Sequence, residues 1–222
     1  MGEFVTLQTA DNQNIAAYVA KPTGKPKGGL VVCQEIFGVN NHIRSVTDGY
    51  AADGFLAIAP ALFDRIEKNV ELGYDQTGMQ TGIALMKQAS LDSALADVTA
   101  AKAFIAEAGK TAILGFCWGG TVAWAAACRL EGLAAAIPYY GGGIGNLLGE
   151  KPRCATMAHF GNQDQSIPMD VVEKIKASHP EVAVHVYDAG HGFNCNERAS
   201  FNGPAAELAR KRSLDFLSKA LG

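Results

Sequence analysis

Short apolar runs, separated by polar turns or by longer segments of helical periodicity, recur along the whole chain. Eight runs have the length and composition of β-strands; they cover residues 4–9, 15–20, 30–34, 55–59, 112–116, 134–140, 155–160 and 182–187. After the second run they alternate with helical segments, which predicts a mostly parallel sheet. Runs such as LVVCQ and AILGF are apolar on both faces, as expected for strands that helices cover on two sides. The pattern therefore predicts an α/β fold, a three-layer α/β/α sandwich whose first two strands form an antiparallel hairpin at one edge.

Two helices stand out in the pattern. The first has Ser90 as its N-cap, ends at Gly109 and carries one apolar stripe, formed by Leu91, Leu95, Val98, Ala101 and Ile105. The second runs from about Pro204 to Leu221. Residues 63–88 are harder to assign, because three glycines, Gly73, Gly78 and Gly82, interrupt any helix there. We expect that segment to form a partly irregular cap over a site at the sheet edge.

Composition limits the class of protein. With 222 residues, 48% of them hydrophobic and 18% charged, the chain can bury one substantial core, so residues 1–222 are expected to form a single domain. The net charge of −3 and the lack of a long basic run argue against nucleic acid as a partner. Neither a signal peptide nor a run of about 18 apolar residues is recognisable, which predicts a cytoplasmic protein without membrane contact. We expect a monomer or a small homo-oligomer.

The most informative motif is GFCWGG at residues 115–120, where a predicted strand runs directly into a predicted helix. A side chain at such a sharp corner projects clear of the backbone, and the helix N-terminus favours negative charge that develops there. The motif differs from the nucleophile elbow G-x-S-x-G in carrying sulfur, which makes Cys117 a candidate nucleophile. The five cysteines include no C-x-x-C pair, so they indicate neither a disulfide framework nor a zinc ribbon.

A thiol nucleophile needs a base and a group that orients the base. Asp164 follows one predicted strand in GNQDQSIP and His191 follows the next in DAGHGFN, so nucleophile, acid and histidine occur in the chain order of α/β-hydrolases. Taken singly, each residue has a simpler explanation as packing, a helix cap or a turn residue. Together they stand at the carboxyl ends of strands that meet at one sheet edge, which favours a catalytic triad. The backbone N–H groups of Trp118 and Ile36 are then the expected oxyanion hole.

Four segments together resemble the dienelactone hydrolase family: QEIFGVN at residues 34–40, GFCWGG, GNQDQSIP and AGHGFN. The similarity spans nearly the whole chain. The resemblance implies an α/β-hydrolase fold and a cysteine hydrolase that acts on lactones or esters without a cofactor. It also implies Cys117 as nucleophile, His191 as base, Asp164 as partner of the base, and Glu35 as an additional carboxylate near the thiol. No metal site is expected, because the histidines lack ligand spacing.

Glu35 raises an electrostatic question, because a carboxylate beside a thiol opposes thiolate formation. The resemblance implies that this glutamate holds the resting thiol and releases it when substrate arrives. Substrate recognition departs from the family, since the positions of its two carboxylate-binding arginines fall near Met79 and at Cys195. Neither side chain can bind a carboxylate, which leaves Arg198 and Arg44 as substitutes. The candidate substrate contacts are Tyr140, Phe37 and Arg198.

The favoured hypothesis is a hydrolase that forms a thioester at Cys117 and acts on lactones or on activated enol or aryl esters. The alternative is a non-enzymatic protein on the same fold that binds a small molecule or senses redox state through Cys117. A third interpretation is nucleotide binding through GIGNLLG at residues 143–149. That pattern is unspecific, and it does not follow a first βα unit.

Overall fold

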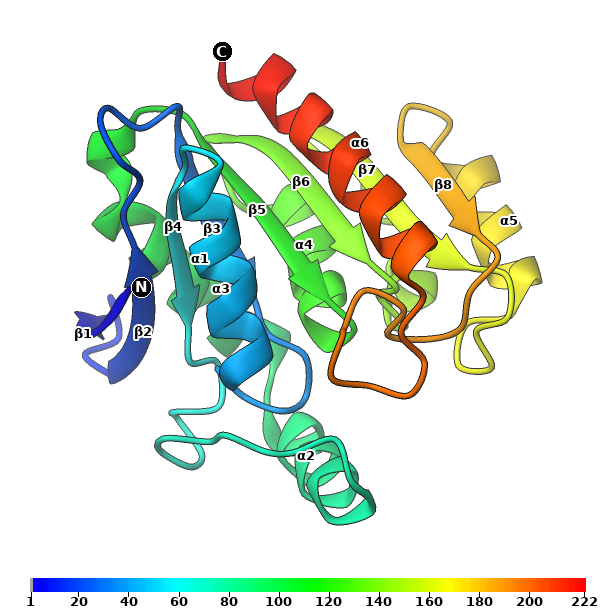
Figure 1. Ribbon diagram of the computed structural model, residues 1–222, viewed down its shortest axis with the longest axis horizontal. Helices are drawn as coiled ribbons and strands as arrows, with labels where there is room; N and C mark the ends of the chain where they lie inside the picture. Colours follow the sequence, from blue (N-terminus) through cyan, green and yellow to red (C-terminus); the bar gives the residue numbers. More distant parts are fainter. Residues whose placement is uncertain (1) are drawn as a thin grey trace.

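The computed structural model describes residues 2–222 as an eight-stranded sheet with helices on both faces (Figure 1). The strands are β1 (Glu3–Gln8), β2 (Asn14–Ala20), β3 (Gly29–Cys33), β4 (Leu56–Pro60), β5 (Thr111–Phe116), β6 (Leu133–Tyr139), β7 (Ala155–Gly161) and β8 (Ala183–Tyr187). Their order is β1-β2-β4-β3-β5-β6-β7-β8. The pairs β1/β2 and β2/β4 are antiparallel, and the remaining neighbours are parallel. The predicted fold class, including the hairpin at one edge, is therefore confirmed.

Helices cover the sheet on two sides. The α-helices are α1 (Asn41–Ala52), α2 (Gln76–Gln88), α3 (Leu91–Phe104), α4 (Trp118–Arg129), α5 (Met169–Ser178) and α6 (Gly203–Leu221), with short 3₁₀ helices η1 (Ala106–Ala108) and η2 (Ile144–Asn146). Helices α1 and α6 pack on one face, and α3, α4 and α5 lie on the other (Figure 1). Both helices that the pattern singled out are present, and the Ser90 hydroxyl caps α3 by accepting a hydrogen bond from the Ser93 N–H at 3.1 Å. None of the helices in residues 2–222 combines the length and hydropathy that a bilayer crossing requires.

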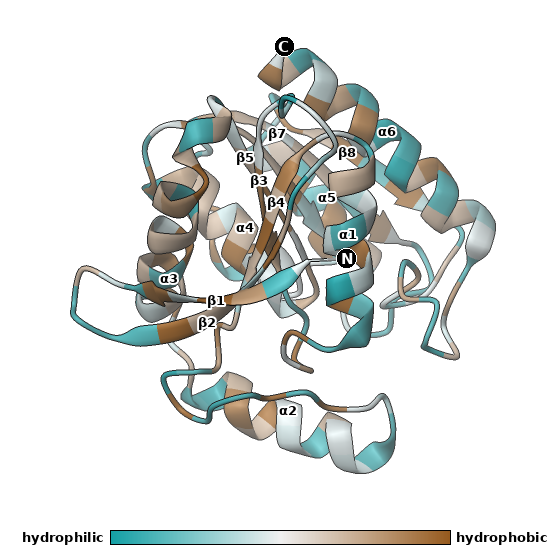
Figure 2. Cartoon of the chain, turned by 60° about the vertical axis from the view of Figure 1, so that its left-hand side comes forward, coloured by the Kyte–Doolittle hydropathy of each residue, from teal (hydrophilic) through white to brown (hydrophobic). Residues whose placement is uncertain are grey.

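The central strands carry the core. Every residue of β3, β4 and β5 is buried, and residues 118–128 of α4 are buried as well. Figure 2 shows the hydrophobic residues concentrated in these inner elements, whereas polar residues lie on the outer sides of α1 and α6. Because the strands are apolar on both faces, helices must cover both, which fixes the three-layer arrangement. The carboxyl ends of β3, β5, β7 and β8 then open toward the same end of the molecule.

Helix α2 corrects one expectation. The glycines of residues 63–88 do not prevent a helix in the second half of that segment. The Asp75 carboxylate caps α2 by accepting from the Gly78 N–H at 2.7 Å. A Cβ atom on Gly78 would stand 2.0 Å from the Gly73 carbonyl oxygen, and one on Gly82 would stand 2.3 Å from the Ile36 carbonyl oxygen. These glycines therefore allow close backbone contact, and they place α2 beyond the carboxyl ends of the strands (Figure 1).

Candidate active site

Cys117 occupies a tight corner between β5 and α4. Its backbone has φ 54° and ψ −117°, a conformation that costs a non-glycine residue about 1–3 kcal/mol. The Cys117 N–H donates to the Tyr139 carbonyl at 3.0 Å, and the Cys117 carbonyl accepts from the N–H groups of Gly120 at 3.0 Å and Thr121 at 3.2 Å. These bonds hold the corner in place. The side chain is only partly buried, so the sulfur is accessible at the sheet edge.

Small residues make this corner possible. A Cβ atom on Gly119 would lie 2.3 Å from the Gln34 carbonyl oxygen, and one on Gly120 would lie 2.4 Å from the Tyr139 carbonyl oxygen. Both distances are far below van der Waals contact. The first turn of α4 can therefore pack directly on the ends of β3 and β6, which brings the residues after β3 close to the sulfur.

His191 and Asp164 meet across the ends of β7 and β8. The Asp164 Oδ2 atom is 2.7 Å from His191 Nδ1. The other carboxylate oxygen accepts from the backbone N–H groups of Ser166 at 2.8 Å and Ile167 at 3.2 Å. Asp164 is 4% exposed. A buried carboxylate fixed by two N–H groups presents its remaining oxygen to the imidazole in one orientation, and the Nε2 atom of the ring is left for another partner.

The environment of His191 favours its protonated form. Burial of the ring alone would lower its pKa, but the hydrogen bond to Asp164 and the influence of the Cys117 side chain outweigh burial and raise the pKa from 6.5 to about 10. Cys117 and His191 line the same cavity, and the Asp164 carboxylate holds His191 from behind. A proton that leaves the sulfur has an acceptor in place, and the positive charge that results is balanced by Asp164.

Glu35 lies at the end of β3 with both carboxylate oxygens engaged. One accepts from Arg198 Nη1 at 3.0 Å and the other from the Tyr74 hydroxyl at 3.3 Å. Glu35 is 1% exposed. The guanidinium of Arg198 also stacks over the rings of Phe37, at 5.7 Å from its centroid, and Tyr74, at 5.9 Å. Arg198 is therefore locked in the wall of the site.

Arg44, the other candidate for binding a substrate carboxylate, points elsewhere. Its Nη1 atom lies 2.6 Å from Glu71 Oε2 and donates to the Val39 carbonyl at 2.8 Å. The half-exposed Glu71 satisfies the charge of Arg44 away from Cys117. Of the two arginines, only Arg198 reaches the candidate site.

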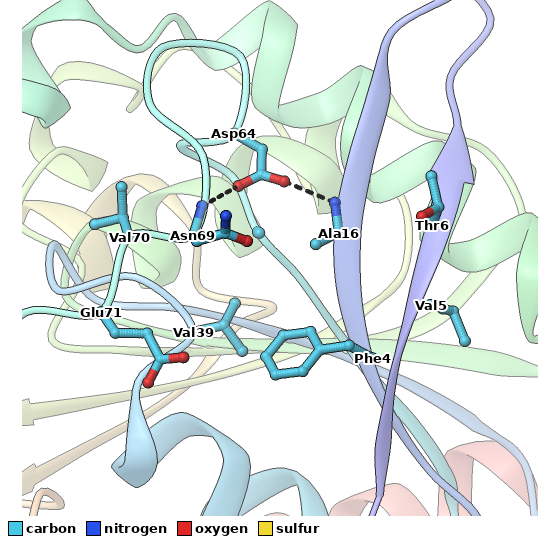
Figure 3. Close-up of a pocket in the computed structure, with 10 residues that line it drawn as sticks. Phe4, Val5, Thr6, Ala16, Val39, Asp64, Asn69, Val70 and Glu71 are labelled. Atoms are coloured by element: carbon cyan, nitrogen blue, oxygen red, sulfur yellow. Dashed lines mark hydrogen bonds between the residues drawn. The ribbon is translucent and has the colours of Figure 1, made fainter.

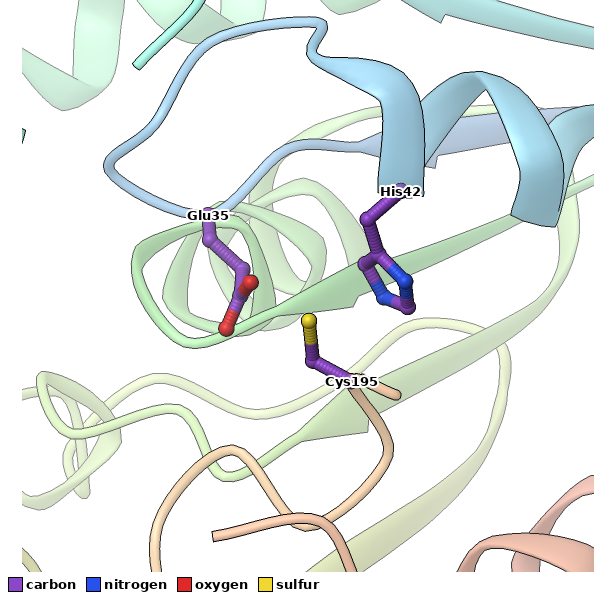
Figure 4. A group of neighbouring side chains, drawn as sticks. All are labelled: Glu35, His42 and Cys195. Carbon is purple, nitrogen blue, oxygen red and sulfur yellow. The ribbon is translucent and has the colours of Figure 1, made fainter. Parts of the chain in front are cut away.

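A buried cluster of Glu35, His42 and Cys195 lies behind the site, and the sequence did not signal it (Figure 4). The side chains point toward one another, with potential ligand atoms within 4.8 Å of one another. His42 Nδ1 lies 3.2 Å from Asn196 Oδ1, and its buried Nε2 atom has no hydrogen-bond partner within residues 2–222. Burial and the Glu35 charge raise the pKa of Cys195 to about 11, so this thiol stays protonated at neutral pH. A protonated thiol is a weak metal ligand.

A cavity of about 510 Å³ opens beside the sulfur. Its lining includes most of the residues singled out from the sequence: Cys117, His191, Ile36, Trp118, Phe37 and Arg198. Tyr140 lies under this surface, with its ring centroid 5.1 Å from that of His191 and its buried hydroxyl unpartnered within residues 2–222. Met79, which the sequence analysis placed at a cap position, lines the α2 side of the cavity together with Ile83 and Met86, which it missed. Their spacing is helical, but the intervening glycines obscured it.

Two further regions carry none of this chemistry. A cavity of about 190 Å³ lies between the N-terminal hairpin and residues 61–71 (Figure 3). Its buried carboxylate, Asp64, accepts from the N–H groups of Ala16 at 2.7 Å and Asn69 at 3.3 Å. The glycine-rich segment 143–149 forms the 3₁₀ turn η2 and not the N-terminus of an α-helix. Neither region presents a nucleophile and a base together.

Comparison with known proteins agrees with this geometry. The profile of the dienelactone hydrolase family matches residues 15–221. The chain belongs to the dienelactone hydrolase family. A carboxymethylenebutenolidase-like protein of Synechocystis sp. is 36% identical over 90% of this chain and 91% of its own. The carboxymethylenebutenolidase of Pseudomonas putida is 29% identical over 97% of this chain and 96% of its own.

Solved structures of the family share the fold. The crystal structure of a dienelactone hydrolase-like protein from Klebsiella pneumoniae superposes with a TM-score of 0.87 at 28% identity, covering 99% of this chain and 98% of that one. Together with the family match, this confirms that the protein is an α/β-hydrolase-fold hydrolase of the dienelactone hydrolase family.

Proposed function

We propose that this hydrolase cleaves lactones or activated enol and aryl esters through a thioester on Cys117. The observation that carries the proposal is the placement of Cys117 and His191 in the lining of one cavity, with the Asp164 carboxylate 2.7 Å from His191 Nδ1. A nucleophile, a base and a group that orients the base are the parts that covalent acyl transfer needs. The names of the relatives, carboxymethylenebutenolidases that by name act on a lactone, support the same substrate class.

In the first half-reaction the sulfur of Cys117 attacks the substrate carbonyl carbon, and His191 holds the proton that the thiol has given up. The carbon–sulfur bond forms, the carbonyl oxygen becomes an oxyanion, and the tetrahedral adduct collapses as the bond to the leaving oxygen breaks. His191 returns its proton to that oxygen. A lactone opens in this step and stays attached, whereas an ester releases its alcohol or phenol.

In the second half-reaction His191 takes a proton from water, and the resulting hydroxide equivalent attacks the thioester. The carbon–sulfur bond breaks, the carboxylic acid product forms, and the proton returns to the sulfur. Thiolate readily expels enolate and phenolate leaving groups, but it expels alkoxide or amide nitrogen poorly. This chemistry favours activated esters over peptides.

The proposed oxyanion hole consists of the backbone N–H groups of Ile36 and Trp118. Both residues line the cavity beside Cys117. Within residues 2–222 neither N–H donates a hydrogen bond to another protein group. Unpaired donors at the start of α4 and after β3 are available to the negative charge that develops on the carbonyl oxygen.

Arg198 reduces the repulsion expected between the Glu35 carboxylate and a thiolate at Cys117. Burial alone would lower the Arg198 pKa, but the negative charge of Glu35 outweighs burial and raises that pKa, and Arg198 lines the same cavity as Cys117. The guanidinium is therefore close enough to offset the repulsion between Glu35 and a thiolate at Cys117. We propose that Glu35 acts in the site through this pair and that Phe37 and Arg198 contact the substrate. Tyr140, expected from the sequence to be a third contact, is buried beneath the cavity surface beside His191 and does not line the cavity.

The test compares steady-state hydrolysis of p-nitrophenyl acetate by the wild type, Cys117→Ala and Cys154→Ala. Cys154 is a half-buried thiol outside the cavity, so its variant controls for loss of any cysteine. We expect sustained turnover by the wild type and Cys154→Ala and none above background by Cys117→Ala. Release of p-nitrophenol that stops after one equivalent would contradict the proposal and favour a protein that only binds its ligand.

A further inference from the structure

The cavity beside Cys117 is apolar along its α2 side. Met79, Ile83 and Met86 follow one another at helical spacing and are only partly buried, so their side chains are exposed to the cavity. Ile36, Phe37 and Trp118 face them from the loop after β3 and the start of α4. Six large apolar side chains thus surround the space above the sulfur. Methionine adapts its shape to different apolar partners at little cost.

The positive charges at the cavity already have partners, since His191 is paired with Asp164 and Arg198 with Glu35. Among residues 2–222, Arg198 is the only lysine or arginine that lines it, and no aspartate or glutamate does. The Arg198 side chain is 14% exposed, and its Nη1 atom is bonded to Glu35, whose side chain is 1% exposed. A substrate carboxylate that recruited Arg198 fully would leave the buried Glu35 with Tyr74 as its remaining partner. Leaving a buried charge unpaired is strongly unfavourable, so the ion pair resists this exchange.

We infer that the preferred substrates are uncharged esters or lactones whose apolar group packs under α2, and that substrates with a carboxylate on that group are rejected. The inference rests on the proposed function, because it assigns the substrate class of the same Cys117 site. The gain in kcat/KM for an apolar substrate depends on how much of its apolar group is buried, since each methylene removed from water under α2 raises kcat/KM about fourfold. A carboxylate in the same place loses its hydration without gaining a partner.

The test uses two p-nitrophenyl esters of nearly the same shape. One is p-nitrophenyl 5-methylhexanoate, and the other is mono-p-nitrophenyl glutarate, in which a carboxylate replaces the terminal isopropyl group. For the wild type we expect kcat/KM to favour the neutral ester by about tenfold or more. Equal rates for the two esters, or faster cleavage of the glutarate, would overturn the inference.

Two lysine variants then locate the selecting surface. Ile83→Lys places a cation inside the cavity, whereas Ala84→Lys places the same charge on the exposed side of α2. We expect Ile83→Lys to lower the preference for the neutral ester by about tenfold, the value of a hydrogen bond to a charged group, and Ala84→Lys to leave it unchanged. Circular dichroism checks that both variants are folded. If Ile83→Lys does not fold, the ratio of kcat/KM for the two esters in the wild type still tests the inference.

The control variant Cys117→Ala separates this inference from the proposed function. If hydrolysis of both esters persists in Cys117→Ala, the proposed function fails. If hydrolysis depends on Cys117 but the wild type shows no preference for the neutral ester, only the substrate assignment fails. An equal effect of Ile83→Lys and Ala84→Lys would refute the role of the α2 surface.

Discussion

Replacing Asp164 with asparagine changes one interaction in the proposed triad while keeping the shape of the side chain. The amide oxygen can still accept from the N–H groups of Ser166 and Ile167, which now bond one carboxylate oxygen. The amide nitrogen then faces His191 Nδ1, where Asp164 Oδ2 stands at 2.7 Å in the wild type. Because that nitrogen donates, Nδ1 must accept, and the ring proton moves to Nε2. His191 then has no free site for the thiol proton.

The pKa of His191 sets the size of the effect. Its rise from 6.5 to about 10 is equivalent to about 5 kcal/mol, at about 1.4 kcal/mol per pKa unit. Asp164 and Cys117 share that stabilisation, so the loss of Asp164 removes about 2–3 kcal/mol, or about 30- to 150-fold in rate. The wrong tautomer adds to this, and in a serine protease the same replacement costs about 10⁴-fold. We expect kcat/KM of Asp164→Asn to fall by about 10²- to 10³-fold.

The assay measures kcat/KM for p-nitrophenyl acetate from pH 6 to pH 10 in the wild type, Asp164→Asn and Asp188→Asn. Asp188 is an exposed carboxylate in the loop that leads to His191, and it serves as the matched control. Thermal unfolding of each variant shows whether the fold is retained. If folded Asp164→Asn keeps more than about a third of wild-type activity, the assigned orientation of His191 by Asp164 is wrong.

Three more measurements test separate parts of the account. Gly82→Ala adds a Cβ atom 2.3 Å from a backbone carbonyl oxygen and should lower the free energy of unfolding by about 1–3 kcal/mol. The control Gly73→Ala, whose Cβ would have nothing within 4 Å, should leave the stability unchanged. Equal stability of the two variants in thermal unfolding would contradict the packing of α2. Folding raises the pKa of His191, so protonated His191 contributes fully to the free energy of unfolding below pH 6.5, and this contribution is lost as the pH rises toward about 10. The difference in stability between the wild type and His191→Gln should therefore shrink over that range. A difference that grows instead would contradict the raised pKa. Iodoacetamide should label the accessible Cys117 long before Cys33, which is 0% exposed and whose pKa burial raises; peptide mass spectrometry that finds both labelled at the same rate would refute this.

The strands and the order of the site residues could be predicted because they follow from local rules. Each predicted strand agrees with an observed one to within one residue at either end. Apolar runs that alternate with helical segments allow few topologies, and parallel strands place the residues that follow them at a common edge. Cys117, Asp164 and His191 come together for that reason.

The cap helix and the cluster behind the site could not be predicted, because both depend on contacts between distant segments. Gly82 is compatible with α2 because the helix lies against the Ile36 carbonyl, and no pattern within residues 63–88 encodes that contact. The pairing of Glu35 with Arg198 spans 163 positions and depends on the path of the irregular segment after His191. Loop conformations of this kind are determined by packing rather than by residue periodicity.

The most direct test of the central claim is mass spectrometry of the enzyme quenched in acid while it hydrolyses p-nitrophenyl acetate. The account predicts an acetyl group on the peptide that contains Cys117, present during turnover, removed by neutral hydroxylamine and lacking in Cys117→Ala. An acyl group carried by another residue during sustained turnover, with the sulfur of Cys117 unmodified, would contradict the account.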